Sequence, residues 1–285
     1  MTSQRSKFTI APDALVEILD NPDVRIVDAS WYLPAQNRNA QVEYAESRIP
    51  GAVFFDIDAI SDKDSALPHM LPAPEEFAAA VGDMGIGENN QIIVYDGPGL
   101  FSCARVWWTF RIMGAKDVRI LDAGFDAWKA AGLPVETGPP AKPSPAVFNP
   151  AFEPDRVRSI EEMRAIIRSR GTTILDARPH SRFTGQAAEP RKGLRSGHIP
   201  GSKSLPIDQL VVDGKLKNIN ELKDIVDSFS LKKHDPVVTS CGSGVTAAII
   251  TLALESVGHA NNALYDGSWS EWGQAEDAPV AVWDD

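Results

Sequence analysis

Hydrophobic residues recur along the first half of the chain in two alternating patterns, one typical of buried strands and the other of amphipathic helices. Short β-branched runs predict strands over residues 24–28, 91–96 and 118–121, and a turn at 48–52 leads into the segment 53–58. Apolar residues at helical spacing predict helices over residues 12–19, 74–83, 102–113 and 124–131. Residues 31–46 are mostly polar and are expected to form a connection.

The same order of patterns returns in the second half. Ser159 and Glu162 form the capping-box signature of a helix that reaches about residue 168, and residues 173–178 predict the strand that follows it. Three pairs of matching positions are separated by similar distances along the chain: Asp28 and Asp176 by 148 residues, Gly51 and Gly201 by 150, and Asp96 and Cys241 by 145. Such constant offsets indicate a duplicated domain.

Strands that alternate with helices predict an α/β fold with two tandem domains, each a mainly parallel sheet flanked by helices. The stretch between the two copies holds seven prolines within residues 133–154 and has little apolar periodicity. We therefore expect a first domain over residues 8–132, a semi-rigid linker over 133–155 and a second domain over 156–283.

The second copy contains the stretch with the clearest chemistry. A β-branched run ends at Cys241, and Gly242, Ser243 and Gly244 lead into the apolar segment 247–254. A strand, a tight glycine loop and a helix N-terminus turn amide N–H groups toward one point and favour a negative charge there. A free cysteine has a pKa of about 8.5, and helix N-termini lower it, so the sequence predicts a nucleophilic thiolate. The alternative reading is a small buried cysteine in a turn.

Ligands of open α/β sheets bind at the carboxyl ends of the strands, where Cys241 lies. The matching residue of the first copy is Asp96, which cannot act as a thiolate. The active site is therefore expected on the second domain, with the first domain as one wall. Arg105 is interpreted as a structural ion-pair partner near the Asp96 loop, and Cys103 as a packed small residue.

Composition excludes several classes of protein. The net charge of −11 comes without any basic block, so nucleic-acid binding is not expected. No apolar run approaches the ~20 residues of a membrane span, and the short polar N-terminus lacks the core of a secretory signal. The chain has only two cysteines and no metal-ligand spacing, so neither a disulfide framework nor a structural zinc is predicted. Free cysteines suit a reducing compartment, and we expect a complete chain in the cytoplasm.

The paired Asp-Ala and Ile-Pro-Gly signals, the Asp-Gly-Ser-Trp segment at 266–269 and the single Cys loop resemble tandem-domain sulfurtransferases of the rhodanese superfamily. The resemblance extends from about residue 8 to 283. Within this family, Cys-Gly-Ser-Gly-Val-Thr at 241–246 is similar to the loop of 3-mercaptopyruvate sulfurtransferases. Thiosulfate sulfurtransferases usually carry Cys-Arg-Lys-Gly-Val-Thr. The resemblance implies that Gly242, Gly244, Val245 and Thr246 line the substrate site.

The resemblance also implies two further groups of residues. Arg182 and Arg191 match substrate-binding arginines of the family, and an arginine grips a carboxylate with two parallel hydrogen bonds. Ser243, His69 and Asp58 match a proton relay, with Asp58 and His69 supplied by the first domain. From the residues alone, each arginine reads as a solvated surface charge, His69 as a loop histidine bonded to backbone, and Asp58 as a helix cap.

The implied reaction moves sulfur from 3-mercaptopyruvate through a Cys241 persulfide to cyanide, a small thiol or a protein dithiol such as thioredoxin, without metal or organic cofactor. Three alternatives remain open. A thiosulfate sulfurtransferase is disfavoured by the neutral Gly242 and Ser243, because a dianion favours nearby cations. A Cys-loop phosphatase is disfavoured by Ala247, where that chemistry needs an arginine. A binding module without turnover is disfavoured by the intact Cys loop.

Overall fold

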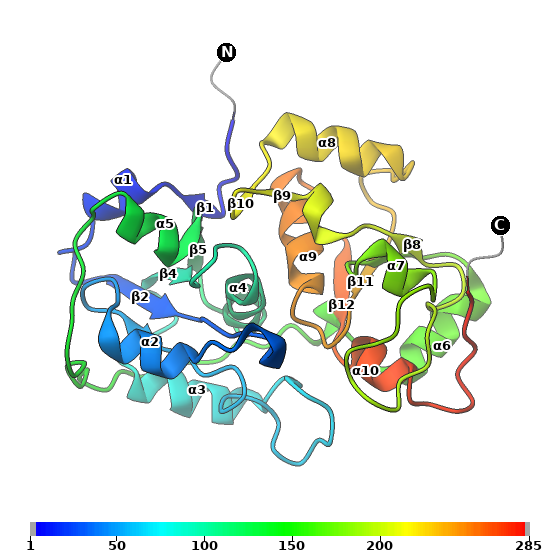
Figure 1. Ribbon diagram of the computed structural model, residues 1–285, viewed down its shortest axis with the longest axis horizontal. Coiled ribbons are helices and arrows are strands. Elements are labelled where there is room, and N and C mark those ends of the chain that lie inside the picture. Colours follow the sequence, from blue (N-terminus) through cyan, green and yellow to red (C-terminus); the bar gives the residue numbers. More distant parts are fainter. Residues whose placement is uncertain (1–3, 283–285) are drawn as a thin grey trace.

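Two α/β halves lie side by side and meet along a pair of central helices (Figure 1). The computed structural model describes residues 4–282, so residue 283, the expected end of the second domain, lies outside the described residues. Each half contains a five-stranded, fully parallel sheet. The predicted fold class is confirmed.

The two sheets have the same topology. The first has the order β1 (Thr9–Ile10), β5 (Asp117–Leu121), β4 (Gln91–Tyr95), β2 (Val24–Asp28) and β3 (Val53–Phe54). The second has the order β6 (Val157–Arg158), β12 (Asn262–Tyr265), β11 (Val237–Ser240), β7 (Thr173–Asp176) and β8 (Lys203–Ser204). Central strand β4 of one sheet therefore corresponds to central strand β11 of the other, and this places Asp96 and Cys241 at equivalent carboxyl ends.

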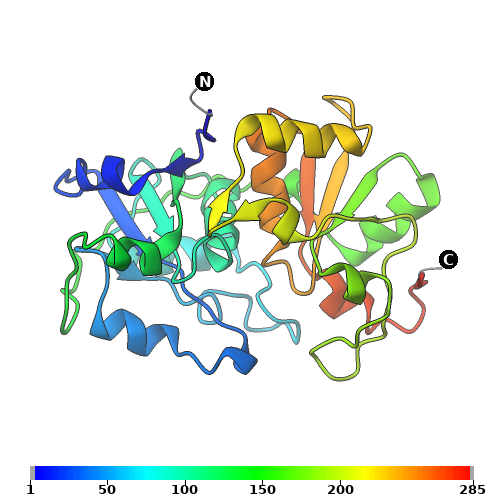
Figure 2. The same cartoon turned by 45° about the horizontal axis from the view of Figure 1, so that its top comes forward.

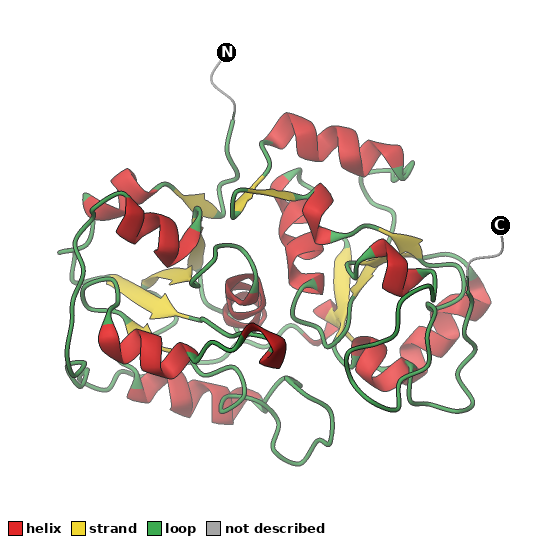
Figure 3. Cartoon of the chain, in the orientation of Figure 1, coloured by secondary structure: helices red, strands yellow, loops and turns green. Residues whose placement is uncertain are grey.

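Helices cover both faces of each sheet, as Figure 3 shows by colour. Those of the first half are α1 (Pro12–Val16), α2 (Ala40–Glu46), α3 (Pro74–Asp83), α4 (Ser102–Ile112) and α5 (Gly124–Ala130). Those of the second half are α6 (Ile160–Ser169), α7 (His180–Phe183), α8 (Ile219–Ser228), α9 (Ala247–Ser256) and α10 (Ser268–Trp272).

One hydrophobic core runs through both halves. Helices α4 and α9 pack against each other, and nearly every residue of both is buried. Their side chains join a single cluster that also contains Val94 of the first sheet and Val237 of the second. Burial on all sides explains why α9 is apolar around its whole circumference, since it touches its own sheet and the other half.

The sequence pattern missed or misjudged several elements. Residues 40–46 form helix α2 rather than a polar connection, because Asn39 accepts a hydrogen bond from the Val42 N–H and caps a mostly exposed helix. Helix α1 ends at Val16, three residues before its predicted end. The 10-residue helix α8 and the antiparallel hairpin of β9 (Val211–Val212) and β10 (Lys215–Leu216) were not predicted.

The proline-rich segment follows the surface of the first half instead of standing free. The Ala146 N–H donates to the Gly82 carbonyl, and the Ala151 N–H donates to the Met113 carbonyl. Phe148 is buried against Phe77 of helix α3. These contacts fix the segment to the first half. The segment has neither helical nor strand periodicity, so a sequence pattern could not predict where it packs.

The hairpin β9–β10 of the second half reaches over to the first half, as the turned view shows (Figure 2). The Gly214 carbonyl at its tip accepts a hydrogen bond from the Ala123 N–H. Gly99, in the Asp96 loop, lies so close that an added Cβ would be 2.8 Å from the Gly214 oxygen. No helix among the described residues is long and apolar enough to cross a membrane.

Candidate active site

Cys241 lies at the carboxyl end of β11, directly before the loop that leads to α9. Its side chain lines a cavity of about 180 Å³, and only 1% of the residue is exposed. The turn after β12 fastens the loop, because the Ser268 hydroxyl accepts from the Cys241 N–H at 3.2 Å and the Trp269 N–H donates to the Cys241 carbonyl at 3.0 Å. The cysteine is thus held at the base of the cavity by hydrogen bonds on both sides of its backbone.

The loop leaves its amide groups open. Within the described chain, no acceptor is bonded to the backbone N–H groups of residues 242–246. The corresponding loop of the first domain binds a carboxylate of its own. The Asp96 carboxylate accepts from the N–H groups of Gly99, Phe101 and Cys103 at 2.8–3.0 Å. A strand–loop–helix segment of the same order therefore binds an anion in one domain and leaves N–H donors open around Cys241 in the other.

Two guanidinium groups lie above Gly242. A Cβ added to Gly242 would be 3.3 Å from Arg182 Nη2 and 3.9 Å from Arg191 Nη1. Arg182 belongs to α7 and Arg191 to the loop after it, and both line the Cys241 cavity. The structure thus brings both predicted arginines to the cysteine.

The two arginines differ in their surroundings. Arg182 pairs with the buried Glu189 through Nη2 and, at 3.2 Å, through Nε. Glu189 also accepts from Arg178, so Arg182 is anchored in a buried ion network. Arg191 has no carboxylate within 4 Å among the described residues. Burial, with the nearby charge of Arg182, lowers the pKa of Arg191, while the attraction of Cys241 raises it.

Ser243, His69 and Asp58 form a continuous chain of contacts between the domains. The Ser243 hydroxyl lies 3.1 Å from His69 Nδ1, and His69 Nε2 lies 3.0 Å from Asp58 Oδ1. The hydrogen bond from His69 holds the pKa of the Asp58 carboxyl below its usual range. His69 is buried, whereas Asp58 is largely exposed. The three predicted relay residues therefore meet, although 174 residues separate His69 from Ser243.

The sequence reasoning missed Trp31 as part of this site. Its indole Nε1–H donates to Asp58 Oδ2 at 2.9 Å, and its ring meets the His69 ring edge-on at 4.9 Å. Together with Phe101 it forms the wall that the first domain contributes to the cavity. Trp31 follows strand β2 at the carboxyl edge of the first sheet, and this position is the signal that could have indicated it.

Gly244, Val245 and Thr246 complete the loop. Gly244 has a φ of +75°, and an added Cβ would lie 2.8 Å from Arg105 Nη1 and 2.9 Å from the Asp266 carbonyl. Only glycine fits that conformation and space. Val245 and Thr246 line the cavity beside Cys241. All residues predicted for the substrate site therefore lie at or next to the cavity.

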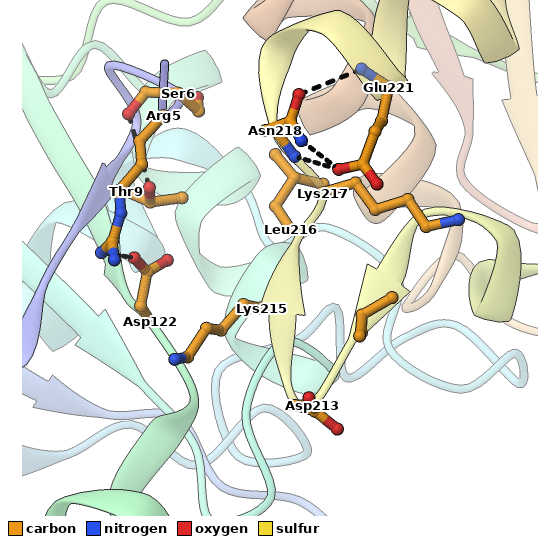
Figure 4. Close-up of a pocket in the computed structure, with 11 residues that line it drawn as sticks. Arg5, Ser6, Thr9, Asp122, Asp213, Lys215, Leu216, Lys217, Asn218 and Glu221 are labelled. Carbon is orange, nitrogen blue, oxygen red and sulfur yellow. Dashed lines mark hydrogen bonds and ion pairs between the residues drawn. The ribbon is translucent and has the colours of Figure 1, made fainter. Parts of the chain in front are cut away.

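A second cavity of about 570 Å³ lies between the N-terminal segment and the β10–α8 connection (Figure 4). Two of its charged groups have local partners, since Arg5 pairs with Asp122 at 2.6 Å and Glu221 caps α8 together with Asn218. It is lined by no cysteine and no histidine, so its larger volume does not make it the better candidate for chemistry. In the part of the chain that is described, no three His, Cys, Asp or Glu side chains are grouped to hold a metal ion.

Two domains with parallel sheets, and one cysteine in a loop whose N–H groups are open, define a class of proteins that transfer a group through a single thiol. The rhodanese-like domain family matches residues 11–131 and 159–275, and the chain belongs to this family.

Several relatives align with this chain over most of its length and most of their own. The chain is 44% identical over 272 residues to the 3-mercaptopyruvate sulfurtransferase of Escherichia coli (strain K12), which covers 95% of this chain and 96% of that relative. It is 40% identical over 296 residues to the mitochondrial thiosulfate/3-mercaptopyruvate sulfurtransferase 1 of Arabidopsis thaliana, covering 96% and 78%. The crystal structure of the Escherichia coli 3-mercaptopyruvate sulfotransferase superposes with a TM-score of 0.84 at 42% identity, covering 93% and 99%.

Proposed function

We propose that this protein takes sulfur from 3-mercaptopyruvate, carries it as a persulfide on Cys241 and passes it to a thiophilic acceptor, with release of pyruvate. The observation that carries this proposal is the meeting of Cys241 with two guanidinium groups and the Ser243–His69 contact in one cavity. The names of the relatives support the same donor. We assign residues 8–132 to a non-catalytic domain, 133–155 to the linker and 156–283 to the catalytic domain.

In the first half-reaction the substrate carboxylate binds Arg191 and Arg182, and its sulfur faces Cys241. The Cys241 thiolate forms a bond to this sulfur while the carbon–sulfur bond breaks. The electron pair of that bond passes to the carbon and gives the enolate of pyruvate. The open amides of the loop stabilise the negative charge on the transferred sulfur.

The relay balances the protons of this step. The substrate thiol gives up one proton, and the enolate carbon needs one to become pyruvate. We assign its uptake and return to Ser243 and His69, with the Asp58 carboxylate stabilising the imidazolium through Nε2. The low pKa of Asp58 keeps that carboxylate ionised while His69 is protonated.

The cavity favours this donor over thiosulfate. The two arginines already occupy the space above Gly242, so a cationic side chain at that position would meet them at close range. Their charges lie where a carboxylate remote from the sulfur would reach them. A thiosulfate-type site needs additional cations directly beside the sulfur, and Gly242 and Ser243 supply none.

In the second half-reaction a nucleophile takes the outer sulfur, and Cys241 leaves as a thiolate. Cyanide, a small thiol or a protein dithiol such as thioredoxin can act as that acceptor, and no cofactor is needed. The apolar mouth formed by Trp31, Phe101 and Ile207 admits acceptors of this kind. We place the protein in the cytoplasm, because two free cysteines suit a reducing compartment.

Mass spectrometry of the intact protein after addition of 3-mercaptopyruvate tests the proposal. The wild type should gain the mass of one sulfur atom and release pyruvate, whereas Cys241→Ser should gain none. Cyanide should then restore the original mass and yield thiocyanate. Absence of the added sulfur from the wild type would favour a binding module.

A comparison of donors on the same preparation tests the substrate. We expect 3-mercaptopyruvate to load Cys241 faster than thiosulfate does, because Gly242 and Ser243 add no further cation to the loop around the sulfur. Faster loading by thiosulfate would overturn the choice of donor while leaving the persulfide mechanism intact.

A further inference from the structure

Arg105 is a buried cation that the reaction described above does not use. It lies on α4 of the first domain, and only 2% of it is exposed. Its guanidinium reaches three separate segments. Nη2 donates to the His69 carbonyl at 2.7 Å and to Asp266 Oδ1 at 2.6 Å, and Nη1 donates to the Gly244 carbonyl at 3.4 Å. A buried arginine needs such partners, because removal of its charge from water is costly.

Asp266 completes the arrangement from the second domain. It follows β12 and is 4% exposed. One carboxylate oxygen pairs with Arg105, and the other accepts from the Leu71 N–H at 2.9 Å. The segment from His69 to Leu71 is therefore held at both ends, at one carbonyl by the arginine and at one amide by the aspartate.

This hold acts on a strained piece of backbone. His69 has a φ of +62°, a left-handed conformation that only a few per cent of non-glycine residues adopt, asparagine, aspartate and histidine more often than others. Such a conformation persists only when surrounding contacts impose it. The contact with Arg105 is made by the carbonyl of His69 itself, so the pair bears directly on the residue whose ring contacts Ser243.

The other end of the arrangement is the cysteine loop. Gly244 follows Ser243 directly, and its backbone packs against both Arg105 Nη1 and the Asp266 carbonyl. One ion pair thus contacts the backbone beside each partner of the Ser243–His69 contact, in two different domains. The length of that contact, 3.1 Å, depends on where the two backbones are held.

We propose that Arg105 and Asp266 are positioning residues, a clasp between the domains that places the His69 ring against Ser243 for the proton transfer of the first half-reaction. This inference rests on the proposed function. Neither side chain lines the Cys241 cavity, and Arg105 reaches the cysteine loop only at the Gly244 carbonyl, so we expect the relay to carry its effect. Transfer of the persulfide sulfur to cyanide needs no relay, and the clasp should not influence that step.

Arg105→Lys and Asp266→Asn test the clasp. Lysine keeps the charge but lacks the planar fork that reaches several acceptors at once. Asparagine keeps the shape but loses the ion pair. Stopped-flow loading of Cys241 by saturating 3-mercaptopyruvate should slow by about 30- to 100-fold in either variant, as expected when reacting groups are displaced by about 1 Å. Transfer from the loaded enzyme to cyanide should keep the wild-type rate.

A matched control lies on the same helix. Arg111 of α4 pairs with the buried Glu255 of α9 at 2.8 Å and so crosses the same interface without approaching the site. Arg111→Lys and Glu255→Gln should lower the unfolding temperature as the clasp variants do, yet leave both half-reactions unchanged. Equal loading rates in Arg105→Lys and Arg111→Lys would overturn the proposal, as would equal slowing of both half-reactions in Arg105→Lys.

A double variant separates positioning from general damage. If Arg105 acts through His69, adding Arg105→Lys to His69→Gln should slow loading no further, because residues acting as a unit are not additive. Multiplied losses would contradict the clasp. Failure of the wild type to form any persulfide from 3-mercaptopyruvate would instead refute the proposed function, so the two failures are distinguishable.

Discussion

The two arginines above Cys241 contribute differently to substrate binding, because only one of them already has a carboxylate partner. The charge of Arg182 is largely compensated by Glu189, whereas among the described residues Arg191 has only the Ser243 hydroxyl, at 3.4 Å. Burial without a carboxylate partner leaves Arg191 ready to pair with an incoming anion. Within this site the neighbours of each arginine therefore matter more than its distance from the sulfur.

We expect Arg191→Gln to raise the KM for 3-mercaptopyruvate more than Arg182→Gln does. Loss of a hydrogen bond to a charged group costs about 1.5–3 kcal/mol, so the increase for Arg191→Gln should be about 10- to 100-fold. Arg182→Gln should have the smaller effect because its charge is shared with Glu189. Steady-state kinetics of the two variants provide the measurement, and the reverse order would contradict this interpretation.

Asp28 and Asp176 occupy the same position in the two domains and have different partners. Asp176 pairs with Arg178, while position 30 of the first domain holds Ser30 in place of the arginine. Burial raises the pKa of Asp28 from its ordinary value of 3.8 to about 6. An acid whose pKa is raised on folding binds more protons in the native state, so stability is lost as the pH rises from about 4 to 6 and stays low above that.

Asp28→Asn should therefore stabilise the protein at pH 7.5 and remove this pH dependence. One pKa unit corresponds to about 1.36 kcal/mol, so the gain is expected to be about 3 kcal/mol at most. Asparagine can still accept from the Ser30 N–H, which donates to Asp28 at 2.9 Å. Asp176→Asn is the counterpart and should destabilise, because it leaves Arg178 without its partner. Urea unfolding at pH 5 and 7.5 measures both, and a loss of stability in Asp28→Asn at pH 7.5 would contradict the expectation.

At the scale of elements, the strand–loop–helix unit occurs twice, and its loop is filled in the first domain and open in the second. In the unit of β4 and α4, the Asp96 side chain fills its own amide loop, and the hairpin tip at Gly214 covers it. In the unit of β11 and α9, the cysteine leaves the amides open and a cavity remains. The residue at the end of the central strand is thus a carboxylate that fills its loop in one domain and a cysteine that leaves the loop open in the other.

Removal of the Asp96 carboxylate should destabilise the first domain. Asp96→Ala leaves three buried N–H groups without an acceptor, and each costs about 1–3 kcal/mol. We expect a loss of several kcal/mol, with a smaller loss for Asp96→Asn, which keeps one acceptor oxygen. Chemical denaturation monitored by tryptophan fluorescence checks this order. An Asp96→Ala variant as stable as the wild type would show that the loop needs no anion.

At the scale of the whole molecule, the two domains share one hydrophobic cluster and one site, and each domain has a further cluster of its own. Helices α4 and α9 pack against each other at the centre, and His69, from the first domain, contacts Ser243 of the second. The N-terminal segment adds a further link, since the Ile219 N–H donates to the Gln4 carbonyl. Helix α4 of the first domain and helix α9 of the second are therefore each buried in part by the other domain.

We therefore expect the chain to unfold in a single transition. Two independent domains would unfold in two transitions. Here, unfolding of one domain would expose the buried helix α4 or α9 of the other, so each domain is unstable without its partner. Calorimetry should give a van't Hoff enthalpy close to the calorimetric one, and Arg111→Lys should shift the whole transition. Two resolved transitions would contradict a shared core.

Several parts of this arrangement were accessible from sequence because they depend on neighbours along the chain. The capping box of Ser159 and Glu162 is formed as predicted, and the strand before Cys241 ends at Ser240. Helix α2 escaped prediction because its face is mostly exposed and lacks an apolar stripe. The expected ion pair of Arg105 is confirmed, and its partner, which the sequence did not indicate, is Asp266, 161 residues away.

The sequence by itself determined the duplication, the parallel α/β class and the open loop around Cys241, because caps, glycines and the periods of strands and helices act over a few residues. The tertiary structure alone decided which distant groups meet that cysteine. Trp31 meets Asp58 within the first domain and Glu189 meets Arg182 within the second, whereas Arg105 meets Asp266 across the interface of α4 and α9. Each pairing depends on how the chain folds back on itself, and no local pattern encodes that.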